Sequence, residues 1–105
     1  MSDATKFDGE KPRVSLVPMQ AVLAVAQVMT FGADKYGPYN WKQGMDWSRL
    51  YSAAQRHQIQ FWEGEDIDPE SGLHHLAHAI CNLMMLYEYT RICEEKDDRY
   101  KNSNR

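Results

Sequence analysis

Long apolar runs, paired cysteines and excess positive charge are all missing from this sequence of 105 residues. No stretch approaches the roughly 20 apolar residues that span a bilayer, and residues 1–13 lack the hydrophobic segment of a secretory signal. A net charge of −3 argues against partners such as nucleic acid polymers or anionic membranes. Cys81 and Cys93 fall about 18 Å apart on one predicted helix and cannot pair. We therefore expect a cytoplasmic protein without a membrane span.

Familiar catalytic motifs are also missing. The sequence has no glycine-rich phosphate loop, no Cys-X-X-Cys pair and no Gly-X-Ser-X-Gly turn. The sequence therefore contains no motif that supports catalysis through a covalent nucleophile. What remains is the attack of a water molecule on a phosphorus centre with the help of metal ions.

Hydrophobic periodicity predicts three helices and no sheet, so the expected fold class is all-α. The first helix opens at Pro18 and stops at Gly37, because proline suits the first helical turn and glycine commonly follows a helix end. The second helix starts at residues 46–48, with Asp46 or Ser48 as its cap. The third helix starts at Asp68, also as a cap, and runs to about Lys96.

The predicted organisation is a single helical domain at residues 17–97 between two polar ends. Residues 1–16 lack a sustained periodicity and indicate an extended arm. Polar residues from Glu94 onward predict a frayed end, with residues 98–105 as a tail. The apolar stripe of the first helix is wider than one face, and a domain of this size buries only a modest share of its surface. Both features predict a homodimer or a homotetramer.

An acidic turn joins the second and third predicted helices. Five carboxylates lie within the eight positions 63–70, around a glycine and a proline. Like charges this close repel one another, and a bound cation relieves the repulsion; hard oxygen ligands suit Mg²⁺ or Mn²⁺. The predicted metal ligands are Glu65, Asp66, Asp68 and Glu70. The alternative is that these charges only cap a helix N-terminus and face solvent.

Histidines lie on both sides of the acidic turn in the sequence. At 100° per residue, Ser71, His75, His78 and Asn82 fall on one side of the third helix, opposite its apolar residues. Such polar groups either face water or line a shared polar site. His57 recurs with apolar residues on the second helix, which fits either a core histidine or a site residue. Because a neutral imidazole accepts a proton from attacking water, the predicted catalytic residues are His57, His75 and His78.

Basic and aromatic residues provide predicted contacts to a phosphorylated ligand. The loop at residues 39–47 combines tryptophans and a tyrosine with an amide, a set that can stack on a base and hydrogen-bond its edge. The same tryptophans could instead cap the end of the bundle. Cations of the arm could fold over phosphates or remain solvated. The predicted substrate contacts are Lys6, Lys11, Arg13, Lys35, Tyr36, Asn40, Trp41, Arg56 and Asn82.

Several sequence blocks resemble one family of short proteins. They are KFDGEKPR (residues 6–13), FGADKYG (31–37), NW (40–41), RH (56–57), GEDIDPESGL (64–73) and HLAHA (75–79). The family is the phage-associated dATP/dGTP diphosphohydrolases, a branch of the all-α MazG-like nucleotide pyrophosphohydrolases. The resemblance implies Mg²⁺- or Mn²⁺-dependent cleavage of a purine deoxynucleoside triphosphate to the monophosphate and pyrophosphate, by a helical bundle of more than one subunit. A phage-encoded member would act in the host cytoplasm.

The sequence departs from the wider MazG-like group at the metal ligands. That group carries Glu-X-X-Glu on one helix and Glu-X-X-Asp on a later helix. Here the later helix reads His75-X-X-His78, and the earlier helix reads Gln60-X-X-Glu63. The four-carboxylate assignment is therefore not carried over, and the acidic turn takes the predicted metal role. The alternative function is a non-catalytic protein that captures a nucleotide through the same arm and loop.

Overall fold

The computed structural model describes residues 11–101. Three helices form the fold in this range: α2 (Met19–Tyr36), α3 (Trp47–Trp62) and α4 (His75–Ile92). Short 3-10 turns accompany them: η2 (Val14–Leu16), η3 (Asn40–Gln43) and η4 (Glu94–Lys96). Within residues 11–101 the only sheet-like pairing is one isolated bridge, so the predicted all-α class is confirmed. None of the described helices is long and apolar enough to cross a membrane.

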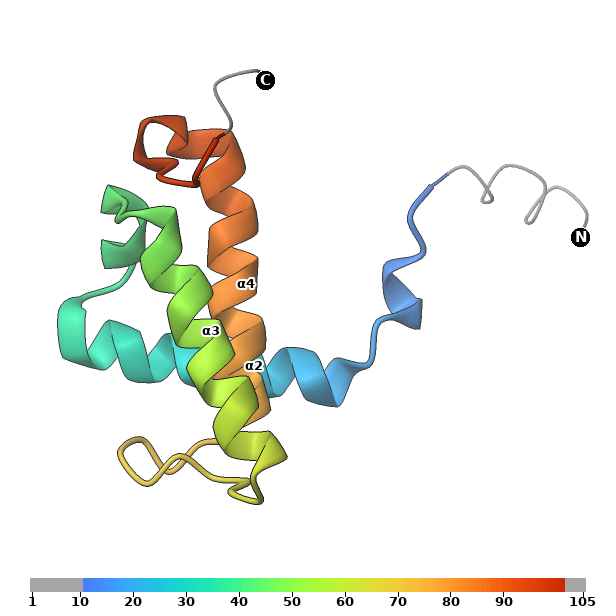
Figure 1. Cartoon of the computed structure of the whole chain (residues 1–105). Coiled ribbons are helices and arrows are strands. Elements are labelled where there is room, and N and C mark those ends of the chain that lie inside the picture. The colour runs from blue at the N-terminus through green and yellow to red at the C-terminus, as the bar shows by residue number, and fades with distance from the viewer. Residues whose placement is uncertain (1–10, 102–105) are drawn as a thin grey trace, which may run out of the picture.

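The two later helices form the centre of the structure. α3 and α4 run antiparallel and make the most extensive helix–helix contact, and α2 crosses behind them at a steep angle (Figure 1). One cluster of buried side chains joins α2 to α4 through Val25, Val28, Ala77 and Cys81. A second cluster joins the start of α3 to the end of α4 through Trp47, Leu50, Tyr89 and Cys93. The segment before α2 projects away from this core (Figure 1).

α2 begins and ends where the sequence predicts. Pro18 occupies the N-cap position, and Gly37 ends the helix with φ of 95°, a conformation that favours glycine. The Gly37 N–H donates to the carbonyl oxygen of Ala33 at 2.8 Å, which closes the last turn. The chain then turns through η3 toward the start of α3.

The predicted start of α4 at Asp68 is wrong, because the helix begins at His75. The residues between them form a tight loop whose side chains satisfy its own backbone. Asp68 Oδ1 accepts the N–H of Glu70, and Ser71 Oγ accepts the N–H of Leu73. Short polar side chains that bond locally in this way compete with the helical hydrogen bonds.

The predicted fraying from Glu94 onward is wrong for the residues that the structure describes, up to 101. Asp98 accepts a hydrogen bond from the Ser48 N–H at 2.9 Å and another from the Ser48 hydroxyl, so it caps α3 from the far end of the chain. Of the two predicted caps, Asp46 and Ser48, Asp46 occupies the N-cap position but makes no side-chain bond there. The Arg99 guanidinium also lies over the Trp47 ring. Residues 102–105 of the predicted tail lie outside the described residues.

Candidate functional site

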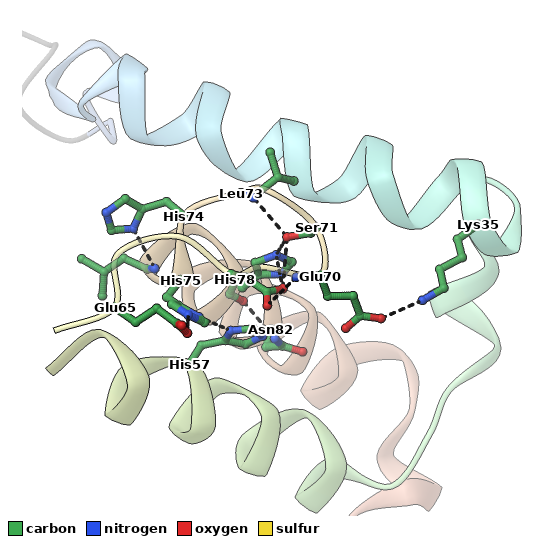
Figure 2. A network of polar contacts seen from close by, with 12 residues as sticks. Lys35, His57, Glu65, Glu70, Ser71, Leu73, His74, His75, His78 and Asn82 are labelled. Atoms are coloured by element: carbon green, nitrogen blue, oxygen red, sulfur yellow. Dashed lines mark hydrogen bonds and ion pairs between the residues drawn. The ribbon is translucent and has the colours of Figure 1, made fainter. Parts of the chain in front are cut away.

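Three histidines meet in the interior where α3, α4 and the intervening loop come together (Figure 2). His75 is completely buried, with 0% of its surface exposed. Its Nε2 lies 2.7 Å from Glu65 Oε1, and its Nδ1 lies 2.9 Å from His57 Nδ1. Both ring nitrogens of His75 are therefore engaged inside the protein. Of the two alternatives for the polar side of α4, the structure selects the shared polar site.

The contacts of His75 with Glu65 and with His57 indicate which nitrogen of each imidazole carries the hydrogen. A carboxylate only accepts, so the Nε2–H of His75 donates to Glu65. In the tautomer that carries its hydrogen on Nε2, the Nδ1 of His75 accepts the Nδ1–H of His57. The other nitrogen of His57, Nε2, keeps a lone pair. The chain Glu65–His75–His57 thus orients an imidazole as a proton acceptor.

His78 forms the second half of the cluster. Its ring stacks on that of His57, with centroids 4.5 Å apart and planes inclined by 10°. Burial lowers the pKa of both His57 and His78, and the charges of neighbouring imidazoles lower it further, although Asp68 partly offsets this at both rings. Both rings are therefore neutral near pH 7 and able to accept a proton.

Asp68 and Ser71 hold His78 from the loop. His78 Nε2 lies 2.7 Å from Ser71 Oγ and 3.5 Å from Asp68 Oδ2, and Ser71 Oγ is 3.1 Å from the same carboxylate oxygen. Burial alone would raise the pKa of the Asp68 carboxyl, but bonds from the Glu70 N–H and the Ser71 hydroxyl hold that pKa below its usual value. An anionic side chain and a neutral imidazole are thus kept side by side.

The carboxylates of the acidic turn point to different sides of the loop and do not converge on one site. Glu65 and Asp68 face the histidines. The side chain of Glu70 is 74% exposed, and its Oε2 lies 3.5 Å from Lys35 Nζ, on the side of the loop that faces the end of α2 (Figure 2). Asp66 is exposed, and its backbone carbonyl accepts the first N–H of α4 at 2.8 Å. Within residues 11–101, no three His, Cys, Asp or Glu side chains converge closely enough to hold a metal ion by themselves.

A cavity of about 550 Å³ opens beside the histidine cluster, with walls from all three helices and from η3. This volume lies within the range of small-molecule sites. Its floor is apolar, and none of the described residues that line it is an aspartate or a glutamate. The lining residues with aromatic, amide, imidazole or charged groups are Phe31, Tyr36, Tyr39, Asn40, Trp41, Arg49, Arg56, His78 and Asn82.

The cavity brings together only part of the predicted substrate contacts. Those that line it are Tyr36, Asn40, Trp41, Arg56 and Asn82. Lys35 does not line it and pairs instead with Glu70. Lys11 and Arg13 are exposed on the segment before α2, also outside the cavity lining. Lys6 lies outside the described residues.

One residue of the site, Arg49, is missed by the sequence analysis. Arg49, Ala53 and Arg56 line the cavity at the spacing i, i+4 and i+7, which is one face of a helix. That spacing is visible in the sequence, but it gains meaning only when one knows which face of α3 meets the cavity. The sequence predicts Ser71 on the same side of the third helix as His78, and the two side chains do meet, but Ser71 lies in the loop before α4 and reaches His78 because that loop folds back.

The two tryptophans of the predicted base-binding loop have different roles. Trp47 is a core residue, and its Nε1–H donates to the carbonyl oxygen of Cys93 at 3.1 Å. Trp41 lines the cavity and is fixed from behind by Tyr89, a fully buried residue. The Tyr89 hydroxyl donates to the Trp41 carbonyl oxygen, and the two rings stack with centroids 6.2 Å apart. Trp47 therefore has the structural role, whereas base binding by Trp41 stays a prediction.

Comparison with known proteins places these features in context. The sequence matches the family model described as "dATP/dGTP diphosphohydrolase, N-terminal" over residues 1–99. A protein of Salmonella phage PMBT28 named "dATP/dGTP diphosphohydrolase" is 39% identical over 94 residues, which cover 90% of this chain and 32% of that relative. The chain therefore spans about a third of the length of the curated relative that it matches. No solved structure matches the chain.

Proposed function

This chain belongs to the dATP/dGTP diphosphohydrolase N-terminal family, and we propose that it binds purine deoxynucleoside triphosphates and hydrolyses them to the monophosphate and pyrophosphate. The observation that supports this most is the composition of the cavity. Trp41 with Asn40 offers a surface for a base, and Arg56 with His78 offers contacts for phosphates. A nucleotide needs both kinds of contact within one site.

In the proposed reaction, water attacks a phosphorus atom of the α–β bridge, the bridging P–O bond breaks, and pyrophosphate leaves. His57 or His78 takes the proton of the attacking water, since burial keeps both rings neutral. His75 acts on the reaction through His57, because its buried ring is occupied at both nitrogens. Asn82 lines the cavity and donates to the backbone carbonyl of His78, which leaves its side-chain oxygen for the ligand.

The proposed reaction would use a divalent ion bound together with the substrate. Glu65 and Asp68 each place a carboxylate at the histidine cluster, whereas Asp66 is exposed and Glu70 pairs with a lysine. Mg²⁺ usually takes one or two protein carboxylates and completes its shell with substrate phosphates and water, and nearby imidazoles also suit Mn²⁺. Glu65 and Asp68 are therefore the residues that would hold Mg²⁺ or Mn²⁺. The ion would neutralise phosphate charge.

A second candidate function is nucleotide capture without hydrolysis. Two observations favour it. The described residues contain no ready-made group of three metal ligands, and the chain spans about a third of its curated relative. In that case the same cavity would bind the nucleotide, and catalytic groups would come from elsewhere.

The test is to incubate the purified chain with dATP or dGTP in Mn²⁺ and to resolve the products by chromatography. Hydrolysis predicts monophosphate and pyrophosphate in equal amounts, and loss of both products in EDTA. His57→Asn should abolish turnover. His74→Asn is the matched control, because His74 is the N-cap of α4 and asparagine keeps a capping oxygen.

The outcomes separate the candidates. Intact nucleotide recovered in a one-to-one complex would support capture and exclude hydrolysis by this chain. Turnover that survives His57→Asn would move the reaction away from the histidine cluster. A protein that neither binds nor cleaves either nucleotide would overturn both functions.

A further inference from the structure

We infer that Arg49 and Arg56 form a two-point clamp for the polyphosphate chain of the ligand, an inference that rests on the proposed nucleotide binding. Both arginines lie on the face of α3 that lines the cavity, with Ala53 between them. Seven residues are about two helical turns, so the two side chains leave the helix about 10 Å apart along its axis. This spacing matches an extended chain of phosphates better than a single phosphate.

The charges around the cavity support an anionic ligand. No carboxylate among residues 11–101 lies within ion-pair distance of Arg49 or Arg56, and no aspartate or glutamate of that part of the chain lines the cavity. Arg91, in contrast, pairs with Glu88 on the surface. Two guanidinium groups therefore line the same cavity, in a protein whose net charge is −3. Guanidinium groups bind phosphate oxygens bidentately, so this concentration of charge fits phosphates.

The clamp also gives the ligand a direction. Arg49 is in the first turn of α3, next in the chain to η3, which carries Asn40 and Trp41. Arg56 precedes His57, whose ring stacks on His78 at the other end of the cavity lining. A base held at η3 thus extends its phosphates along α3, past Arg49 and then Arg56, with the α–β bridge between the two arginines. Arg49 takes the phosphate role that the sequence predicts for Lys35.

The test measures equilibrium binding in EDTA, where metal-dependent hydrolysis is absent. The ligands are dAMP, dATP and inorganic tripolyphosphate. The native chain should bind dATP more tightly than dAMP, and tripolyphosphate should compete with dATP. Arg56→Ala should weaken dATP about tenfold and leave dAMP little changed, whereas Arg49→Ala should weaken both about tenfold. Arg91→Ala is the matched control and should change neither; circular dichroism checks the fold of each variant.

Each result bears on the clamp separately from the proposed function. If tripolyphosphate binds through both arginines but no nucleotide binds, the clamp stands and the nucleotide function falls. If dAMP and dATP bind equally and tripolyphosphate does not compete, the clamp is overturned while nucleotide binding stands. Equal dATP affinity in the native chain and in both arginine variants also overturns it. Phosphate-dependent binding without any turnover in Mn²⁺ retains the clamp and removes hydrolysis.

Discussion

His57, His75 and His78 are the same residue type within a few ångströms of one another, yet their surroundings give them different roles. His75 is occupied at both nitrogens and shielded from solvent. His57 keeps a free nitrogen, and His78 lines the cavity. A substitution at His75 should therefore act by releasing His57 from its orientation. The difference arises from Glu65, because its carboxylate accepts the Nε2–H of His75 and leaves Nδ1 of His75 to contact His57.

Glu65→Gln and Glu70→Gln provide a matched pair of substitutions in the acidic turn. Glu65 contacts His75, so its loss should lower the Mn²⁺-dependent hydrolysis rate by about 10²-fold, the scale of a lost acid–base contribution. Glu70 pairs with Lys35 on the outer side of the loop, so Glu70→Gln should retain activity. Steady-state product formation measures both. Equal losses in the two variants would favour the sequence-based prediction that all four carboxylates bind metal.

The histidine cluster also predicts how the stability of the metal-free protein depends on pH. Burial lowers the pKa of His57 and His78 in the folded state below the unfolded value of 6.5. Below about pH 6.5 the unfolded chain binds more protons than the folded one, so the free energy of unfolding decreases as the pH falls. Above that pH the two rings are neutral in both states, so their contribution to the free energy of unfolding no longer changes with pH. Urea midpoints in EDTA should therefore be level between pH 8 and pH 7 and decline toward pH 5.

His57→Gln removes one of these two groups and should flatten the decline. A native midpoint that stays constant or rises from pH 7 to pH 5 would contradict the burial of the two rings. Protonation of Asp68 also lowers the free energy of unfolding as the pH falls, but its pKa lies below 3.8, outside this pH window.

At the scale of the elements, a hydrogen bond from α4 supports the η3 turn. Tyr89 is fully buried, and its hydroxyl donates to the Trp41 carbonyl oxygen. Tyr89→Phe keeps the ring but leaves that carbonyl without its donor, which should lower the free energy of unfolding by about 1 kcal/mol. It should also weaken nucleotide binding, because Trp41 loses its support. Urea unfolding and binding of dATP in EDTA measure the two effects.

Tyr100→Phe is the control for this substitution, since Tyr100 is 87% exposed and lines neither the cavity nor the apolar groove of α4. It should leave both quantities unchanged. Native affinity for dATP in Tyr89→Phe would mean that the position of Trp41 does not depend on this bond.

The elements also explain how far the sequence predicts this structure. Local signals sufficed for α2, because a proline before it and Gly37 after it act within one turn of the helix. Local signals misplaced the start of α4, because Asp68 and Ser71 bond inside their own loop instead of capping a helix. The cap of α3 was not predictable, since Asp98 reaches Ser48 only in the folded chain. The histidines were predicted individually, but their order of contact was not.

At the scale of the whole molecule, apolar residues remain exposed on one side of the α2–α4 pair. The outer face of α4 is 40–66% exposed at Ile80, Leu83, Met84 and Tyr87, and these residues line a groove of about 430 Å³ that reaches Val25 and Met29 of α2. A contiguous exposed apolar surface of this kind marks an interaction site. The polar side of α4 is already used by the histidine cluster. The apolar side is therefore the surface on which the predicted homodimer or homotetramer would assemble.

Substitution of Met84 tests this assembly. A second copy that covers the groove would bury Met84, so the native chain should elute with twice the mass of 12.2 kDa in light scattering, and Met84→Glu should give the monomer mass. Ile59→Glu is the matched control, because Ile59 is equally exposed but lies on α3, outside the groove lining. A monomer mass for the native chain at every concentration would contradict the dimer. A dimer that persists in Met84→Glu and dissociates in Ile59→Glu would move the interface to α3, where it would lie beside the histidine cluster instead of behind it.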